Sequence, residues 1–192
     1  ASFDSAGSRL FTATYRTEER WFLDEHRTKA GDALVPGTGF IELATQALRA
    51  QGEKSAFEIK DLYFLRPLAV SDIEARDIRV TLPRSDMGYD FLVESGTSGT
   101  LEQNAQASLS LVPFAAPAPV DIGAIAARCA APREAGELGW ISSPQEAHLK
   151  FGPRWRVLQT TAYGDGEGLA RLRLPDAAKE DAKSGYLLHP GL

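Results

Sequence analysis

The sequence has few residues that form covalent or metal cross-links. Its 192 residues include one cysteine, Cys129, and three histidines. A single cysteine excludes an internal disulfide bond and a cysteine-based zinc site. The setting of this cysteine, AIAARCAAP, indicates a small apolar position on a helix rather than a nucleophile. Absence of disulfides is typical of a reducing compartment, so we expect a cytoplasmic protein.

Long apolar runs and an excess of basic charge are also absent. No stretch approaches the roughly 20 apolar residues of a membrane span. The N-terminal ASFDSAGSRL lacks a basic segment followed by an apolar one, so we expect neither membrane association nor a signal peptide. The 21 Lys and Arg residues against 26 Asp and Glu give a formal net charge of -5, which argues against a nucleic-acid groove. The 43% hydrophobic content is that of a globular protein with a sizeable core.

Residues 1–112 predict an α+β unit. Phe11, Ala13 and Tyr15 alternate with polar residues, which indicates a half-buried strand. In GFIELATQALRAQG the apolar residues recur every three or four positions, which predicts a mostly buried helix that stops near Gly52. Strand-like runs follow, namely FEIKDLYFLRPLAV, RDIRVTLP, GYDFLVESG and NAQASLSLV. A buried helix followed by consecutive antiparallel strands implies a sheet wrapped around that helix.

The composition changes after Val112. Residues 113–138 are rich in alanine and proline, and we interpret them as a linker with one short helix at Ile122–Cys129. From 139 to 192 the ordered pattern resumes. SPQEAHLKFG predicts a short helix, and RWRVLQTTAYGDGEGLARLRLP predicts a hairpin that turns at GDGEG.

The segment LDEHRTKAGDALVPGTGFIELA places a histidine, His26, in an expected loop shortly before the buried helix. Gly31 allows close backbone approach to a ligand, and the helix start near Thr38 offers unpaired N–H groups and a positive dipole end. A base beside such a group suits proton abstraction next to a carbonyl. Two simpler readings stay open: a surface or packing role for the histidine, and a helix cap by Thr38 or Gly39 with Pro36 setting the turn.

The same segment resembles the first signature of the dehydratase domains of modular polyketide synthases, in which His, three residues, Gly, four residues and Pro lead into a helix. Here four residues separate His26 from Gly31, so either Ala30 takes the glycine position or the loop holds one extra residue. FLRPLAV, HLKFGPRWRVLQ and GYLLHPGL resemble later parts of the same family, in the same order. Phe151 and Trp155 stand where that family has tyrosine and phenylalanine.

The resemblance implies a double hot-dog fold, with a complete N-terminal hot-dog and the beginning of a second. It also implies removal of water from a β-hydroxyacyl thioester. His26 is the implied base, and Gly31, Pro36, Thr38 and Gly39 would surround the thioester carbonyl. In the second half, Gly152 and Pro153 would shape the pocket wall. The acid of this family is an aspartate, expected beyond Leu192. His189 and Pro190 are expected to be structural, and His148 is expected to be a surface or packing residue.

The partners that the resemblance implies are an acyl carrier protein and the neighbouring synthase domains, with a homodimer as a further expectation. No cofactor is implied, because the substrate rides on the phosphopantetheine arm of the carrier. Arg154 and Arg156 could form part of a basic docking patch, or of an ordinary solvated strand face. Thioester hydrolysis, ring closure by addition of a hydroxyl to the enoyl product, and a non-catalytic packing or docking module remain alternatives to dehydration.

Overall fold

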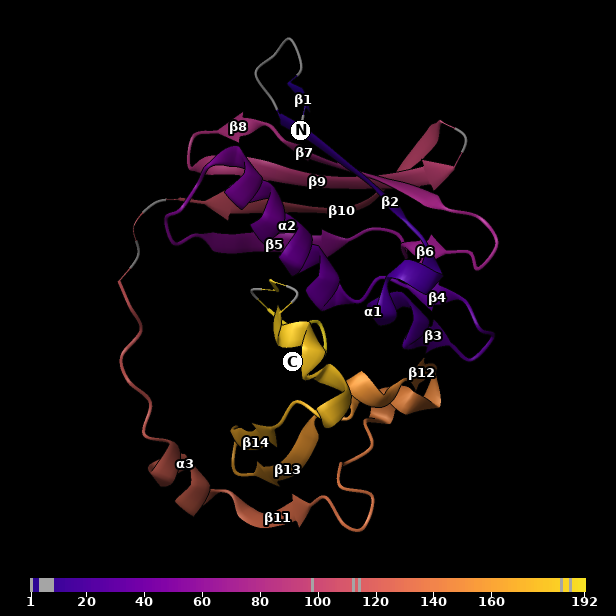
Figure 1. Ribbon diagram of the computed structural model, residues 1–192. Helices are drawn as coiled ribbons and strands as arrows, with labels where there is room; N and C mark the ends of the chain where they lie inside the picture. Colours follow the sequence, from indigo (N-terminus) through magenta and orange to yellow (C-terminus); the bar gives the residue numbers. More distant parts are fainter. Residues whose placement is uncertain are drawn as a thin grey trace.

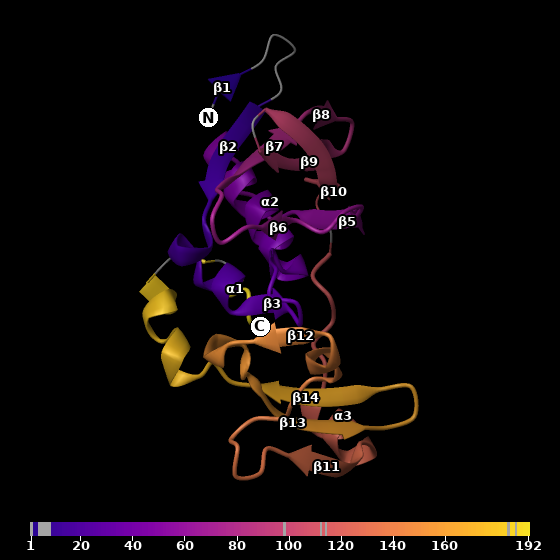
Figure 2. The same ribbon diagram turned by 90° about the vertical axis from the view of Figure 1, so that its right-hand side faces the viewer.

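The computed structural model describes residues 2–3, 9–97, 99–111, 113, 115–183, 185–186 and 188–192. Figures 1 and 2 show the larger sheet and helix α2 at one end, a smaller sheet at the other, and β3 and β12 between them. The predicted boundary at Val112 lies outside the described residues. In the ranges given above, no helix is both long and apolar enough to cross a membrane.

The larger sheet contains seven antiparallel strands within the described ranges, in the order β1-β2-β7-β9-β10-β5, with β8 paired to β9. Alternating burial, as in β7 with Ile78, Val80 and Leu82 inside, follows from the two-residue period seen in the sequence. The strands are β1 (Ser2–Phe3), β2 (Arg9–Tyr15), β5 (Glu58–Phe64), β7 (Arg76–Leu82), β8 (Arg84–Ser85), β9 (Gly88–Thr97) and β10 (Thr100–Ser110).

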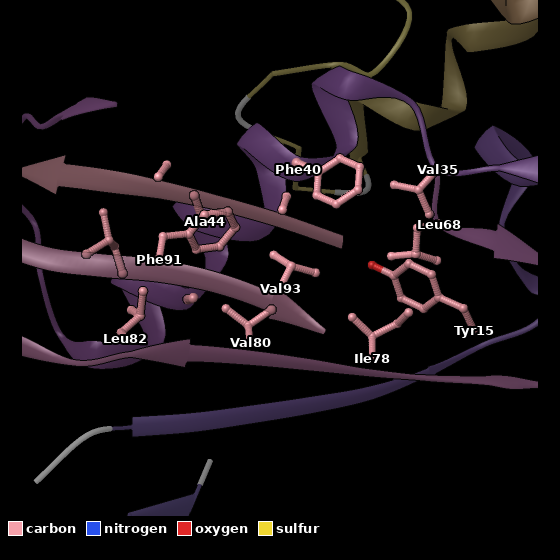
Figure 3. Close-up of a cluster of buried hydrophobic side chains, with 14 of the residues drawn as sticks. Tyr15, Val35, Phe40, Ala44, Leu68, Ile78, Val80, Leu82, Phe91 and Val93 are labelled. Atoms are coloured by element: carbon pink, nitrogen blue, oxygen red, sulfur yellow. The ribbon is translucent and has the colours of Figure 1, made fainter. Parts of the chain in front are cut away.

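Helix α2 (Gly37–Gln51) lies against one face of this sheet, as predicted (Figure 1). It ends at Gly52, whose φ of 95° is the left-handed conformation that favours glycine at a helix end. Phe40 and Ala44 point from α2 toward Phe91 and Val93 of β9, and all of these are buried (Figure 3). This layer of helix and sheet is the hydrophobic core of the molecule.

A second sheet joins the two ends of the molecule, in the order β12-β3-β4-β6. It contains β12 (Leu149–Phe151), β3 (His26–Thr28), β4 (Ala33–Leu34) and β6 (Ala69–Val70). The expectation of a loop at His26 is wrong, because this residue begins β3 and pairs with Phe151. The run FEIKDLYFLRPLAV is also not one strand: it divides at Pro67, so that β5 and β6 belong to different sheets. The short elements η1 (Thr17–Glu19) and α1 (Trp21–Asp24) precede β3.

The remainder of the chain builds a smaller sheet, β11-β13-β14. Helix α3 (Ile122–Arg128) forms as predicted, with the Asp121 carboxylate accepting from the Ala124 N–H at 2.9 Å. Residues 130–134, expected in the linker, instead form a strand along β13. The elements are β11 (Ala130–Glu134), η2 (Pro144–Ala147), η3 (Pro153–Trp155), β13 (Leu158–Tyr163), β14 (Gly168–Leu172), η4 (Asp176–Ala178) and η5 (Glu180–Lys183). The expected helix at Ser143 is thus a single 3-10 turn, with Ser143 and Glu146 forming a capping box.

Candidate functional site

The His26 imidazole is held by one hydrogen bond and two aromatic rings. Its Nδ1 lies 2.9 Å from the carbonyl oxygen of Leu34. Because a carbonyl oxygen only accepts, Nδ1 carries the proton and the neutral ring keeps its lone pair on Nε2. The ring centroid lies 5.5 Å from that of Phe151 and 5.1 Å from that of Trp155. The side chain therefore presents a single basic nitrogen in a fixed orientation.

The environment of His26 also favours the unprotonated ring. Burial lowers its pKa below the ordinary 6.5, since desolvation disfavours the charged form, and the bond to the Leu34 carbonyl opposes this only in part. A neutral imidazole near neutral pH is the form in which a histidine can accept a proton. The electrostatics of the site thus suit a general base.

Of the four residues that separate His26 from Gly31, Arg27 and Thr28 belong to β3, and Lys29 and Ala30 form the turn toward β4. Gly31 has a φ of 110°, and its N–H donates to the Thr28 carbonyl at 3.1 Å. The Thr28 hydroxyl donates to Asp32, whose own N–H donates back to that hydroxyl. Gly31 thus takes a left-handed turn position. The N–H of Gly31, a residue that the family resemblance places near the thioester carbonyl, is already bonded within this turn.

Arg27 anchors the same turn to its surroundings. Its guanidinium donates to the Gly31 carbonyl at 2.8 Å, and it forms ion pairs with Asp24 at 3.0 Å and Asp72 at 2.8 Å. The bond to Asp72 raises the pKa of Arg27, while burial opposes this rise. The residue next to His26 therefore ties β3 to α1 and to the loop after β6.

The start of α2 differs from the simple capping interpretation. Pro36 is the N-cap, and no side chain caps this end of the helix. The Thr38 hydroxyl donates to the carbonyl oxygen of Pro190 at 2.7 Å, a contact between residues 152 positions apart. A Cβ on Gly39 would lie 3.0 Å from a methyl carbon of Val35, so glycine permits close packing there. The helix start is held by tertiary contacts rather than by a cap.

An apolar pocket of about 340 Å³ opens at the start of α2. Its lining includes Leu34, whose carbonyl holds His26, and Gly37 of the first helical turn. Phe40 and the 57%-exposed Phe64 form part of its wall. Such a volume is within the range of small-molecule sites, and the helix start adds N–H groups and a positive dipole end.

The second half of the chain contacts Glu25, the residue before His26, through Gly152 and Arg154. The Gly152 N–H donates to the Glu25 carbonyl at 2.9 Å, and the Arg154 N–H donates to the Glu25 carboxylate at 2.7 Å. Pro153 is the exposed first residue of η3. The Arg154 guanidinium pairs with Glu25 and with Asp181. Burial alone would lower the pKa of this guanidinium, but the two carboxylates outweigh burial and raise it.

His189 completes this set of contacts from the C-terminal segment. Its Nδ1 accepts the Gly191 N–H at 3.1 Å, which leaves the proton on Nε2, 3.2 Å from the Asp181 carboxylate. The ring stacks on Trp21 with centroids 5.0 Å apart. Buried and bonded in this way, His189 occupies a structural position, whereas His148 is exposed at the end of η2.

Sequence reasoning missed Glu25, Asp181 and Trp21, since carboxylates and a tryptophan in short irregular segments carry no periodic signal. The docking hypothesis for Arg154 stays a prediction; its guanidinium is engaged in ion pairs with Glu25 and Asp181. Arg156 is exposed, with its guanidinium carbon 4.3 Å from the centre of the Trp140 ring.

An antiparallel sheet packed around one long helix, as seen here with α2, defines the hot-dog class of folds. The dehydratase domain from the CurF module of the curacin polyketide synthase aligns with a TM-score of 0.84 at 20% identity, over all of this chain and 69% of the other. An inactive CurJ dehydratase, titled as a histidine-to-phenylalanine mutant, aligns at 0.85 and 22%, over 100% and 66%. An inactive CurK dehydratase, titled as an aspartate-to-asparagine mutant, aligns at 0.80 and 17%, over 96% and 64%. These likenesses establish the fold.

The sequence comparisons then identify the family. Residues 1–96 match the family described as "Polyketide synthase dehydratase domain", and residues 117–192 match "Polyketide synthase dehydratase N-terminal domain". Polyketide synthase PksN of Bacillus subtilis is 28% identical over 95% of this chain, and a spectinabilin synthase protein of Streptomyces orinoci is 29% identical over 90%. The chain belongs to the polyketide synthase dehydratase domains. It spans 3% and 5% of these two relatives, which are large synthases.

Proposed function

We propose that this domain dehydrates a β-hydroxyacyl thioester to the α,β-unsaturated thioester, with His26 as the base. Nε2 takes the α-proton, the β-hydroxyl leaves with a second proton as water, and the carbon–carbon double bond forms between them. An aspartate beyond Leu192 supplies the second proton. The substrate is carried on the phosphopantetheine arm of an acyl carrier protein, and no other cofactor takes part.

The observation that carries this proposal is the hydrogen bond from His26 Nδ1 to the Leu34 carbonyl. It directs the lone pair to Nε2, and burial lowers the pKa of the ring, so the base is unprotonated near neutral pH. The titles of the two inactive relatives, one with an altered histidine and one with an altered aspartate, agree with an acid–base pair of these residue types.

The thioester carbonyl is assigned to the start of α2. Pro36 and Gly39 shape this turn, while Gly37 and Thr38 provide its first N–H groups. Gly31 contributes through the turn that carries β3 rather than through its N–H, which Thr28 already occupies. The apolar pocket beside Leu34 accepts the acyl chain, and Gly152 and Pro153 bound the site from the second half.

The test is substitution of His26 by alanine, with His148→Ala as the matched control on an exposed histidine. The assay follows loss of water from a β-hydroxyacyl group on a carrier protein, by mass spectrometry, in the full-length protein. His26→Ala should lower kcat by roughly 10²- to 10⁴-fold, the contribution of a positioned base, and His148→Ala should not change it.

Near-normal turnover by His26→Ala would contradict the single-base mechanism. If the unaltered protein binds the carrier-linked substrate without releasing water, the domain is a non-catalytic module. A cyclic product with no enoyl intermediate would instead assign ring closure. Size-exclusion chromatography tests the expected homodimer, and the same assay on monomeric and dimeric fractions shows which of the two is active.

A further inference from the structure

Arg154 lies between the strand of His26 and the C-terminal segment that holds Asp181 and His189. Two residues before it, the Gly152 N–H donates to the Glu25 carbonyl, and directly after it, Trp155 packs on the His26 ring with centroids 5.1 Å apart. Its guanidinium carbon also lies 5.2 Å from the centre of the Trp21 ring. The side chain is 26% exposed. Most of it is therefore enclosed between the histidine strand and the C-terminal segment.

On one side Arg154 holds the residue immediately before His26. Both oxygens of the Glu25 carboxylate are used, one by the Arg154 N–H at 2.7 Å and the other by the guanidinium Nη1. The Glu25 side chain is 10% exposed, so this charge depends on Arg154 for compensation. Glu25 is also the C-cap of α1, and its position sets where β3 begins.

On the other side Arg154 holds the turn that contains His189 and Gly191. Its Nε donates to the Asp181 carboxylate at 2.9 Å, and His189 Nε2 donates to the same oxygen at 3.2 Å. A Cβ on Gly191 would lie 2.8 Å from the Arg154 carbonyl oxygen, so the backbones of these residues are in close contact. The carbonyl oxygen of Pro190, which lies between His189 and Gly191 in the chain, accepts a hydrogen bond from the Thr38 hydroxyl of α2.

We propose that Arg154 is a positioning residue for the reaction: it sets the histidine strand and the His189–Gly191 turn at a fixed distance from each other. This inference rests on the base role proposed for His26. A guanidinium suits the task because its planar set of donors serves two carboxylates at once, one through Nη1 and one through Nε. A lysine ammonium has the charge without that geometry.

The expected consequence is on turnover rather than on binding. The groups that Arg154 contacts are Glu25, Asp181 and Trp21, none of which is assigned to the substrate. Misplacement of reacting groups by about 1 Å costs on the order of 100-fold in rate. Loss of Arg154 should therefore lower kcat and leave KM nearly unchanged.

The test compares Arg154→Lys and Arg154→Met with Arg156→Met in the full-length protein. Arg156 is the matched control because it is exposed and lies one residue beyond Trp155. We expect kcat to fall on the order of 10-fold for Arg154→Lys and on the order of 100-fold for Arg154→Met, with KM within about 2-fold.

A second readout is independent of turnover. Hydrogen–deuterium exchange should rise in peptides that cover His26–Thr28 and in those that cover His189–Leu192 when Arg154 is replaced, and in neither for Arg156→Met. If the methionine variant does not fold, the lysine variant decides both readouts. Unchanged exchange in both segments, a change in KM that carries the whole loss, or an equal loss in Arg156→Met would overturn the proposal. If the unaltered protein does not dehydrate the substrate, the proposed function fails while the exchange result still decides the role of Arg154.

Discussion

The two ends of the molecule are stabilised in different ways. The buried hydrophobic cluster is drawn from residues between Tyr15 and Leu109, with α2 packed on the seven-stranded sheet. In the smaller sheet, by contrast, every residue of β11 is exposed, and β13 buries one side chain, Ala162. In its described residues, α3 buries none. The larger end therefore holds the large buried cluster, whereas the smaller end buries a few small or medium-sized apolar side chains such as Cys129, Ile141 and Ala162.

The largest effect that tests this contrast is the loss of a core aromatic side chain. Phe91 is 0% exposed in β9, and Phe91→Ala should lower the free energy of unfolding by about 3–5 kcal/mol, because it removes buried apolar surface and leaves a cavity. Phe151→Ala, the same change at the half-buried junction between the two ends, should cost clearly less. Urea unfolding of both variants measures the difference, and equal losses would contradict the description of two unequal ends.

A smaller and more local effect is expected from Gly152. A Cβ there would lie 2.3 Å from Glu25 Cγ and 2.5 Å from its Oε2, so alanine must displace Glu25. Gly152→Ala should lower the free energy of unfolding by about 1–3 kcal/mol, the usual cost of overpacking, and should raise hydrogen exchange in β3 and β12. Gly136→Ala is the control, because no atom lies within 4 Å of its added carbon. A loss of activity without a loss of stability would instead assign Gly152 to the substrate pocket alone.

The same contrast explains how far the sequence predicts the structure. The long elements are predictable because each carries a complete period: the stripe on α2 repeats every three or four residues, and β7 alternates over seven residues. Strands of two or three residues, such as β3 and β4, are too short to show a period. They form because the larger core and β12 hold them in place.

The candidate site divides in the same way. His26 and the start of α2 were found because a titratable residue, a proline and glycines fall close together in the chain. The contacts of Arg154 could not be found in this way, because Glu25 is 129 positions and Asp181 27 positions away from it. Nothing local marks two separate carboxylates as partners of one arginine. Strand β11 was missed because AAPRE has no β-branched or aromatic residue, and it is formed by pairing with β13.

The smallest expected effect comes from protonation of His26, at the junction between the two ends. The pKa of His26 is lowered below 6.5 by burial, so the unfolded chain takes up this proton more readily than the folded one. The free energy of unfolding should therefore fall as the pH drops through about 6.5 toward the lowered pKa, and level off below it with respect to this group. The acid limb of kcat/KM should likewise lie below pH 6.5.

Urea unfolding from pH 7.5 to pH 5 measures the contribution of His26 to this pH dependence. His26→Gln is compared with His148→Gln, since only the former removes the buried imidazole. If both variants keep the pH dependence of the unaltered protein, His26 is not desolvated at the junction. That result would contradict the enclosure of the His26 ring by Phe151 and Trp155.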